Sequence, residues 1–271
     1  ISTTFQPSEF ADTILISSDG VVFFVLAGQL TSHSENAFAG LLSATTSPRP
    51  AALPEVYHVE QTAAVLNVVL HALHGLVLTL YNPDLVTLYA AVDALLVQYA
   101  VPPKLVLCPA TPLFDALLAH AQSKPLEPLD VYAFAAKHNM EDLAIASSAL
   151  LLSFPIDTLS DADAERIGTK YLRKLFCLHM ARVSALHQLL LAMPVPHAAS
   201  PYCTVADAEA MKSAWMLAAA RLNLEARPDH TSHSLQATLS PVLVKVWCKD
   251  CRKALQTRID ALIADWVAVK V

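Results

Sequence analysis

Three of the five cysteines of this chain lie in its last third, where their spacing matches that of metal ligands. Cys248-Lys249-Asp250-Cys251 is a C-x-x-C pair, and Cys203 follows a helix-breaking Ser-Pro-Tyr run. Two thiolates at this spacing suit one tetrahedral metal ion or one small disulfide loop. The other motifs of the chain have no comparable ligand spacing, so these cysteines are the first candidates for chemistry.

A structural zinc site needs a fourth ligand besides Cys203, Cys248 and Cys251. His197 is the first choice because it lies six residues before Cys203 in the same proline-rich loop, and His230 and His233 are the second choice. The alternative is two or three buried reduced thiols, since free cysteine is often buried. A Cys248–Cys251 disulfide is disfavoured in a reducing compartment.

Two other sets of residues are weaker candidates. His71 and His74 share one helix face, which permits metal binding, but without a nearby cysteine or carboxylate they are interpreted as helix-end histidines. Cys177 and His179 are two residues apart on a helix and so point apart, and Cys177 is interpreted as a core residue. We expect no catalytic and no cofactor-binding residues.

The composition of the chain excludes several classes of function. The 271 residues carry a formal net charge of -6, which argues against nucleic acid as a ligand. Hydrophobic residues make up 55% and charged residues 15%, so we expect apolar surface that another chain covers. The five glycines stand alone, which excludes a dinucleotide fingerprint and a P-loop, and neither G-x-S-x-G nor H-E-x-x-H occurs.

The sequence predicts no membrane contact. The longest apolar stretch, residues 63–81, is interrupted by Asn67, His71, His74 and Gly75, whereas a membrane span needs about 20 mostly apolar residues. No signal peptide is visible, and an odd, sparse set of cysteines favours a reduced protein. We therefore expect an intracellular protein, cytoplasmic or nuclear.

The order of elements indicates an α+β chain. β-branched and aromatic runs predict strands at residues 13–16 and 21–25 around a Ser-Asp-Gly turn, the second buried on both faces because residues 21–26 are all apolar. A helical run at 28–42, broken near 33–34, and a strand at 55–59 follow. From Asp84 onward the pattern predicts helices interrupted by prolines, including a pair broken near Asn139 and a helix capped by Ser160.

The first third resembles a BTB/POZ domain. The motifs are Phe10–Ile16, which is similar to the family's opening with Asp before the first strand, Val21–Leu42, Glu55–His58 and Ala63–His74. Residues 130–140 and 171–182 resemble the helical extension of many fungal (basidiomycete-type) members. The resemblance implies a BTB/POZ-like domain at 1–125, a BACK-like helical extension at 126–193 and a C-terminal helical region with the cysteines at 194–271. Leu26-Ala27 replaces a His-Lys pair that the family often has there.

What the resemblance implies is a protein–protein interaction scaffold that homodimerises through its BTB-like domain, with an interface at roughly residues 5–29. An adaptor for a cullin-based ubiquitin ligase, with other proteins including a cullin as partners, is one alternative, although no clear cullin-binding signature is present. An enzyme with an unrecognised pocket between helices is the other. An enzyme requires convergent ionisable groups in a pocket, whereas a scaffold requires an apolar self-complementary surface.

Overall fold

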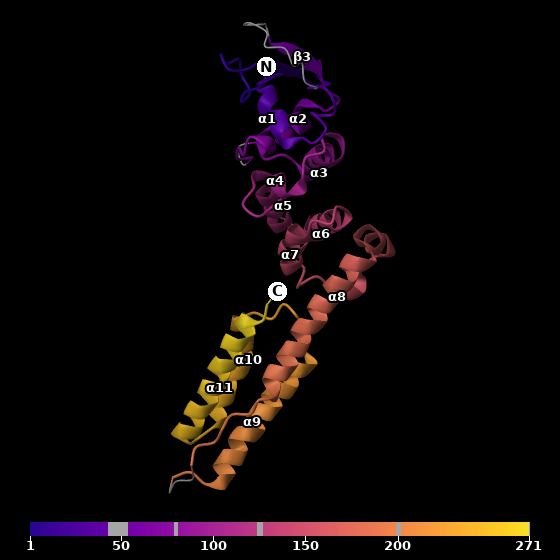
Figure 1. Ribbon diagram of the computed structural model, residues 1–271. Helices are drawn as coiled ribbons and strands as arrows, with labels where there is room; N and C mark the ends of the chain where they lie inside the picture. Colours follow the sequence, from indigo (N-terminus) through magenta and orange to yellow (C-terminus); the bar gives the residue numbers. More distant parts are fainter. Residues whose placement is uncertain (43–53, 79–80, 124–126, 199–201, 271) are drawn as a thin grey trace. The chain divides into compact units, whose positions relative to one another are not determined.

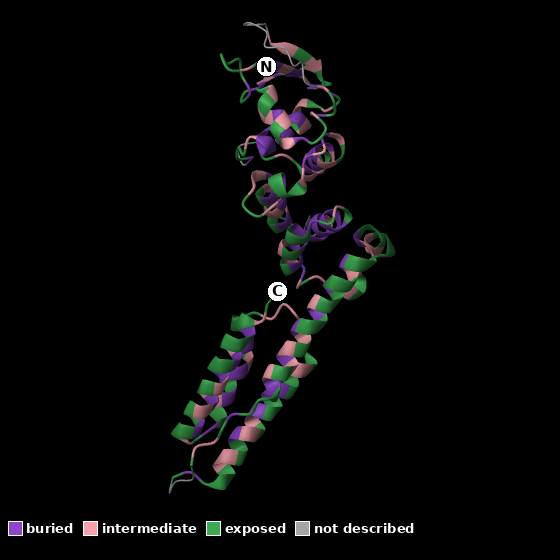
Figure 2. Cartoon of the chain, viewed as in Figure 1, coloured by how far each residue is buried: buried purple, intermediate pink, exposed green. Residues whose placement is uncertain are grey.

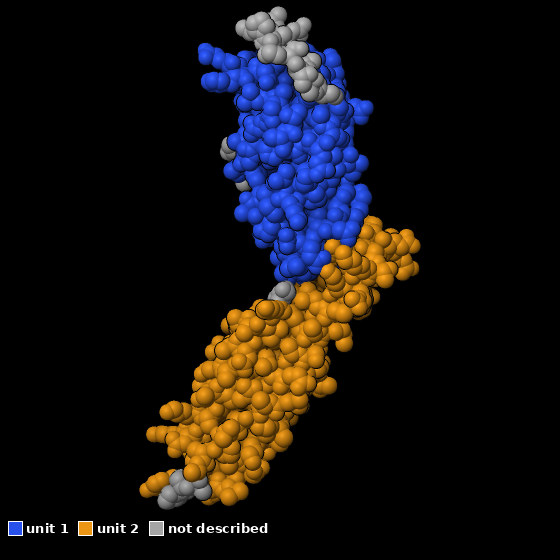
Figure 3. Space-filling model, viewed as in Figure 1, with its two compact units in different colours: residues 1–150 blue, residues 151–271 orange. Residues whose placement is uncertain are grey.

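The chain divides into two compact units, residues 1–150 and 151–271, each of which is described here by itself (Figure 3). The computed structural model describes residues 1–42, 54–78, 81–123, 127–198 and 202–270. A small sheet lies in the first unit and the remainder is mainly helical, which confirms the predicted α+β class (Figure 1). The sequence predicts domain boundaries at 125 and 193, whereas the division of the chain into units falls between residues 150 and 151. Within the described ranges, no helix combines the length and the apolar character needed to cross a membrane.

The three predicted strands form one mixed sheet with the order β2-β1-β3. β1 (Thr13–Ile16) pairs antiparallel with β2 (Val22–Val25), and β3 (Glu55–His58) lies parallel to β1. The tight turn between the first two strands needs Gly20, whose φ is 81°. The Ser17 hydroxyl donates to Asp19 at 2.5 Å and accepts the Val21 N–H at 2.9 Å. These turn contacts set the register that decides which side chains face the core.

The two faces of the sheet differ in burial. Thr13 and Leu15 of β1 are buried together with their β2 partners Val25 and Phe23. The other face is apolar but only half-buried, and it carries Ile14, Ile16, Val22 and Phe24. The prediction that the second strand is buried on both faces is therefore wrong. A continuous apolar run does not distinguish a fully buried strand from one whose second face is left open.

The helical run predicted at 28–42 breaks near 33–34, as predicted, but no helix resumes in residues 34–42. α1 (Ala27–His33) ends where Ser34 binds other segments: its hydroxyl donates to the Tyr99 carbonyl at 2.7 Å and accepts the Phe38 N–H at 2.7 Å. Residues 37–39 then take left-handed φ values of 53–58°, which no α-helix continues through. This turn places the buried Phe38 ring against Tyr99, with centroids 3.8 Å apart.

Helices complete the first unit and cover the buried face of the sheet, with α1 and α2 on one side of it in Figure 1. Asn139, at φ 53°, ends one helix of the predicted pair and separates it from the next, as a short polar side chain in the left-handed region can. The helices after β3 are α2 (Ala63–Leu73), α3 (Leu85–Asp93), the π-helix η1 (Ala94–Gln98), α4 (Pro103–Val106), α5 (Pro112–Ser123), α6 (Glu127–Lys137) and α7 (Glu141–Leu150).

The second unit is a helical bundle. Ser160 caps its longest helix, as predicted, by accepting the Asp163 N–H at 3.1 Å. Each long helix buries one stripe of side chains, visible as purple bands in Figure 2, and the stripes meet in one core around Trp215, Leu255 and Ile259. The elements are η2 (Ile156–Thr158), α8 (Asp161–Leu191, interrupted at Gly168), α9 (Val205–Leu224), α10 (Ser232–Leu239), η3 (Ser240–Lys245) and α11 (Lys249–Ala268).

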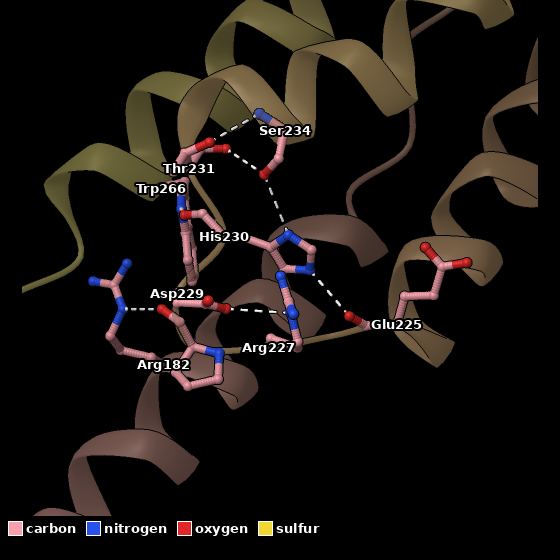
Figure 4. A network of polar contacts seen from close by, with 9 residues as sticks. Arg182, Glu225, Arg227, Asp229, His230, Thr231, Ser234 and Trp266 are labelled. Atoms are coloured by element: carbon pink, nitrogen blue, oxygen red, sulfur yellow. Dashed lines mark hydrogen bonds and ion pairs between the residues drawn. The ribbon is translucent and has the colours of Figure 1, made fainter. Parts of the chain in front are cut away.

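A buried arginine joins three segments at one end of this bundle (Figure 4). Arg182 of α8 donates to the carbonyls of Pro228 and Val269, each at 2.9 Å, and its guanidinium lies 4.3 Å from the centroid of the Trp266 ring. Trp266 in turn donates to the His230 carbonyl at 2.8 Å. α8, the α9–α10 connection and the end of α11 are therefore held by hydrogen bonds as well as by packing.

We predict that Arg182→Met destabilises the second unit by about 2–4 kcal/mol, because the half-buried carbonyls of Pro228 and Val269 lose a charged donor and methionine restores only the packing. Arg173→Met on the exposed face of the same helix is the control and should change stability by no more than about 0.5 kcal/mol. Urea unfolding followed by tryptophan fluorescence measures both, since all three tryptophans lie in the second unit. Equal stability of the two variants would contradict this role of Arg182.

Candidate metal centre

The predicted ligands come from three segments of the second unit. His197 lies in the α8–α9 connection, and Cys203 stands just before Thr204, the N-cap of α9. Thr204 and Asp207 form a capping box, with the Thr204 N–H donating to the Asp207 carboxylate at 2.8 Å, so the backbone around Cys203 is held by local hydrogen bonds. Cys248 is the N-cap residue of α11, and Cys251 lies in the first turn of that helix.

The structure brings all four predicted side chains together. Their ligand atoms, three Sγ and one imidazole nitrogen, lie within 4.8 Å of one another. The Sγ atoms of Cys203 and Cys251 are 3.6 Å apart, and His197 Nε2 is 3.3 Å from Cys248 Sγ. Cys203 and Cys251 are buried, whereas His197 and Cys248 are half-buried. The arrangement has the ligand types and the closeness that one tetrahedral ion requires.

The four groups influence one another electrostatically. The polar backbone at Cys251 is the main influence that lowers the pKa of Cys248, to about 7, and the contact with the His197 ring adds to it. The same contact with Cys248 raises the pKa of His197. Burial, together with the neighbouring sulfurs, raises the pKa of Cys203 to about 12, and burial also raises the pKa of Cys251. Three thiolates this close therefore need a compensating positive charge to coexist.

Two arginines that the sequence analysis did not single out hold the surrounding backbone. Arg258 of α11 donates to the carbonyls of Ala192, at 2.8 Å, and Leu189, which ties the end of α8 to α11. Arg252 donates twice to the Val246 carbonyl, at 2.9 and 3.2 Å, and so closes the turn that leads into α11. The sequence contains a pattern that could have identified Arg258. It follows Cys251 by seven residues, which is two helical turns, and so lies on the same face of the helix as that cysteine.

The other histidines predicted as ligands lie elsewhere. His230 belongs to the network of Figure 4, where its ring bonds the Glu225 carbonyl at 3.1 Å and the Ser234 hydroxyl at 3.3 Å, and His233 is exposed. In the first unit, His71 and His74 each donate from Nδ1 to the carbonyl four residues earlier, at 2.7 and 2.8 Å. Their rings pack on Phe5 in edge-on contacts, as helix-end histidines of a core would.

The sequence predicts that Cys177 is a core residue, and this prediction is wrong. Cys177 is exposed on α8. His179, two residues later, is buried, so the two side chains do point to different sides of the helix. The error arose because the helix has a single buried stripe and an apolar residue type was assigned to the wrong side of it.

A cavity of about 520 Å³ lies in the first unit beside α5. Its lining is mainly apolar, with Val77, Leu78 and Pro83 facing α5, and Asp115 and His120 are its ionisable members. His120 Nε2 hydrogen-bonds the Pro83 carbonyl at 2.8 Å. The volume is in the range of small-molecule sites.

Compared with known proteins, the chain matches no family model, no curated protein and no solved structure. The assignment of its sites therefore rests on the residues and contacts of the chain itself.

The histidine pair of the first unit generates a pH prediction. Burial is the main cause that lowers the pKa of both His71 and His74 in the folded state. The unfolded chain therefore binds protons first as the pH falls below about 6.5, so the contribution of the pair to stability is complete above that pH and is lost below it. We expect the protection of α2 against hydrogen exchange, taken relative to the intrinsic exchange rate at each pH, to fall between pH 7.5 and 5, and His71→Phe to reduce that fall. His233→Phe, at an exposed histidine, is the control; a pH response of α2 that His71→Phe leaves unchanged would contradict the assignment.

Proposed function

We propose that this chain is a protein-interaction scaffold whose first unit homodimerises through the open face of its sheet. The observation that carries the proposal is the composition of that face. Its members in the three strands are Ile14, Ile16, Val22, Phe24, Val56 and His58. Val56 and His58 are exposed and the other four are half-buried. We call this set the open sheet face.

The strand register makes the open sheet face a continuous patch. Ile14 lies directly between Phe24 on one neighbouring strand and Val56 on the other. None of the six members is an acid, a lysine or an arginine, so two copies can face each other without like-charge repulsion. Contiguous exposed apolar surface on a monomer is a usual mark of an interface, and a two-fold axis pairs such a surface with itself.

The resemblance to the BTB/POZ family supports the same proposal. Two strands, a helix, a third strand and then helices follow one another along the first unit. The resemblance implies the same order with a second helix before the third strand, whereas residues 35–42 form turns. Leu26, which stands in place of the first residue of the family's His-Lys pair, is exposed. An apolar side chain at this position favours a contact with an apolar partner over the polar contact that the pair would make.

The second candidate function is that of an enzyme or a small-molecule receptor, and the cavity beside α5 is the observation in its favour. Its apolar lining suits an aliphatic or aromatic ligand. A cullin adaptor would be a special case of the scaffold, in which the dimer carries a further partner.

We predict a mass of twice 29.2 kDa for the full chain at micromolar concentration, measured by light scattering after gel filtration. Val56→Lys places a charge in the middle of the open sheet face and should yield monomers, because the dimer would have to bury it unpaired. Val86→Lys is the matched control: Val86 is 76% exposed on α3, outside the sheet, and this variant should remain dimeric. A wild-type mass of 29.2 kDa, or dissociation of both variants alike, would refute the proposal.

A further inference from the structure

We propose that His197, Cys203, Cys248 and Cys251 bind one zinc ion in a closed, tetrahedral site that stabilises the second unit. The inference is independent of dimerisation, since all four residues lie in the second unit and the open sheet face lies in the first. Three thiolates and one imidazole are a recognised set of structural zinc ligands.

The distances fit one ion. Two sulfurs bound at about 2.3 Å to a tetrahedral centre are about 3.8 Å apart, and a sulfur and a nitrogen about 3.5 Å. The observed distances are 3.6 Å between Cys203 Sγ and Cys251 Sγ and 3.3 Å between Cys248 Sγ and His197 Nε2. A small outward shift of each side chain would admit the ion.

The orientation of the His197 ring is a second, independent observation. Its Nδ1 lies 2.6 Å from the Ala198 carbonyl oxygen, so Nδ1 carries the proton and donates. When the ring binds a metal ion Nε2 carries no proton, and its lone pair then lies on the side where Cys248 Sγ is 3.3 Å away. Metal-binding histidines typically fix their tautomer in this way, by a hydrogen bond from the other ring nitrogen to a carbonyl.

The backbone around Cys248 suits thiolates. Cys248 is the N-cap residue of α11 and Cys251 lies in its first turn, so both sulfurs lie at the N-terminal end of the helix. The positive end of the helix dipole stabilises the net negative charge that three thiolates and one Zn²⁺ leave. With four protein ligands no position is open for a substrate, so the ion is structural rather than catalytic.

The alternative of a disulfide does not fit the geometry. A disulfide needs sulfurs about 2.05 Å apart. Cys203 Sγ and Cys251 Sγ are 3.6 Å apart, and Cys248 is likewise a free cysteine, so the Cys248–Cys251 disulfide is not formed either. The alternative of ordinary buried thiols explains two cysteines in a core, but it does not explain why a histidine from a separate loop directs its free nitrogen at the same point.

The ion would join parts of the unit that are otherwise held only by packing and a few hydrogen bonds. The α8–α9 connection supplies His197, the segment before α9 supplies Cys203, and the start of α11 supplies the C-x-x-C pair. The site therefore ties the starts of α9 and α11 to each other and to the connection between α8 and α9. The four proposed ligands span residues 197 to 251 of the chain, so the unfolded chain does not hold them together in a site. Metal binding therefore contributes directly to folding.

The test measures metal in the full chain purified without chelator under reducing conditions. We expect one zinc per chain by elemental analysis, and the metal-free, reduced chain should bind Co²⁺ with the visible spectrum of a tetrahedral thiolate complex. His197→Gln should weaken zinc affinity by more than about 100-fold, beyond the effect typical of an outer-shell partner. His197→Cys should restore it by supplying a fourth thiolate. Cys177→Ser, at an exposed cysteine outside the site, is the control and should bind zinc as the wild type does.

Four outcomes would overturn the proposal. They are a folded wild-type chain with neither zinc nor the cobalt spectrum, a Cys203–Cys251 disulfide in gently purified protein, iron or copper bound in place of zinc, and full zinc content in Cys248→Ser. Zinc lost equally from Cys177→Ser would count against it as well, since the metal would then not depend on the four residues.

Cys248→Ser separates a ligand from an ordinary cysteine even if the binding assays fail. Serine is among the best N-cap residues, so at the N-cap of α11 this change should leave a metal-free unit equally or more stable. If Cys248 binds zinc, the same change should lower the melting temperature of the second unit and accelerate hydrogen exchange from about Pro194 onward, with residues 1–150 unchanged. Chelation of the wild type should have the same effect, and a stabilised Cys248→Ser would refute the site.

Discussion

The second unit depends on α11, which makes fixed contacts at both ends. Its first turn supplies Cys248 and Cys251, and its last turn places Trp266 under the Arg182 guanidinium. A helix of 20 residues is about 30 Å long, so these two points lie at opposite ends of the core. Between them a single stripe, with Leu255 at its middle, packs on α8, α9 and α10. The stripe alone would permit α11 to shift along its axis or rotate, and the polar contacts at the two ends oppose both movements.

The sheet of the first unit is buried on only one of its two faces, and the packing of that unit depends on this one buried face. The sheet has three short strands, and the helices that follow it cover the side of Leu15 and Phe23. Three strands with one buried face are about the minimum for independent stability. The half-buried Phe24 and the exposed Val56 lie on the other side of the sheet from that core, so among the described residues they contribute little to it. This imbalance agrees with the low share of charged residues in the whole chain.

The sequence predicted those parts of the structure that depend on local patterns. The strands, the cap at Ser160 and the break at Asn139 were accessible, because each follows from residue type and short spacing. The closeness of His197 and Cys203 to the C-x-x-C pair was expected from residue type alone, since about 50 residues separate the two pairs in sequence. What the sequence could not show depends on distant partners. Ser34 ends α1 by bonding the Tyr99 carbonyl, 65 residues away, and Cys177 is exposed because its neighbours on α8 bury a different stripe. The open face of β2 was missed for the same reason, since an apolar run does not tell which of its faces receives a partner.

Two exposed aromatic residues lie beside the cysteine cluster. Tyr202 precedes Cys203 and is 95% exposed, and Trp247 precedes Cys248 and is 88% exposed. In extended backbone successive side chains point to opposite sides, so a residue next to an inward-facing cysteine must face outward. Val246, one further residue back from Cys248, is buried again, as this alternation requires. Cys248 itself is extended, at φ -63° and ψ 129°, and α11 begins directly after it. The position of Trp247 in solvent is therefore a consequence of directing the Cys248 sulfur inward, whereas Tyr202 lies in a turn before Cys203. A large apolar residue beside an inward-facing cysteine should not be interpreted as part of the core.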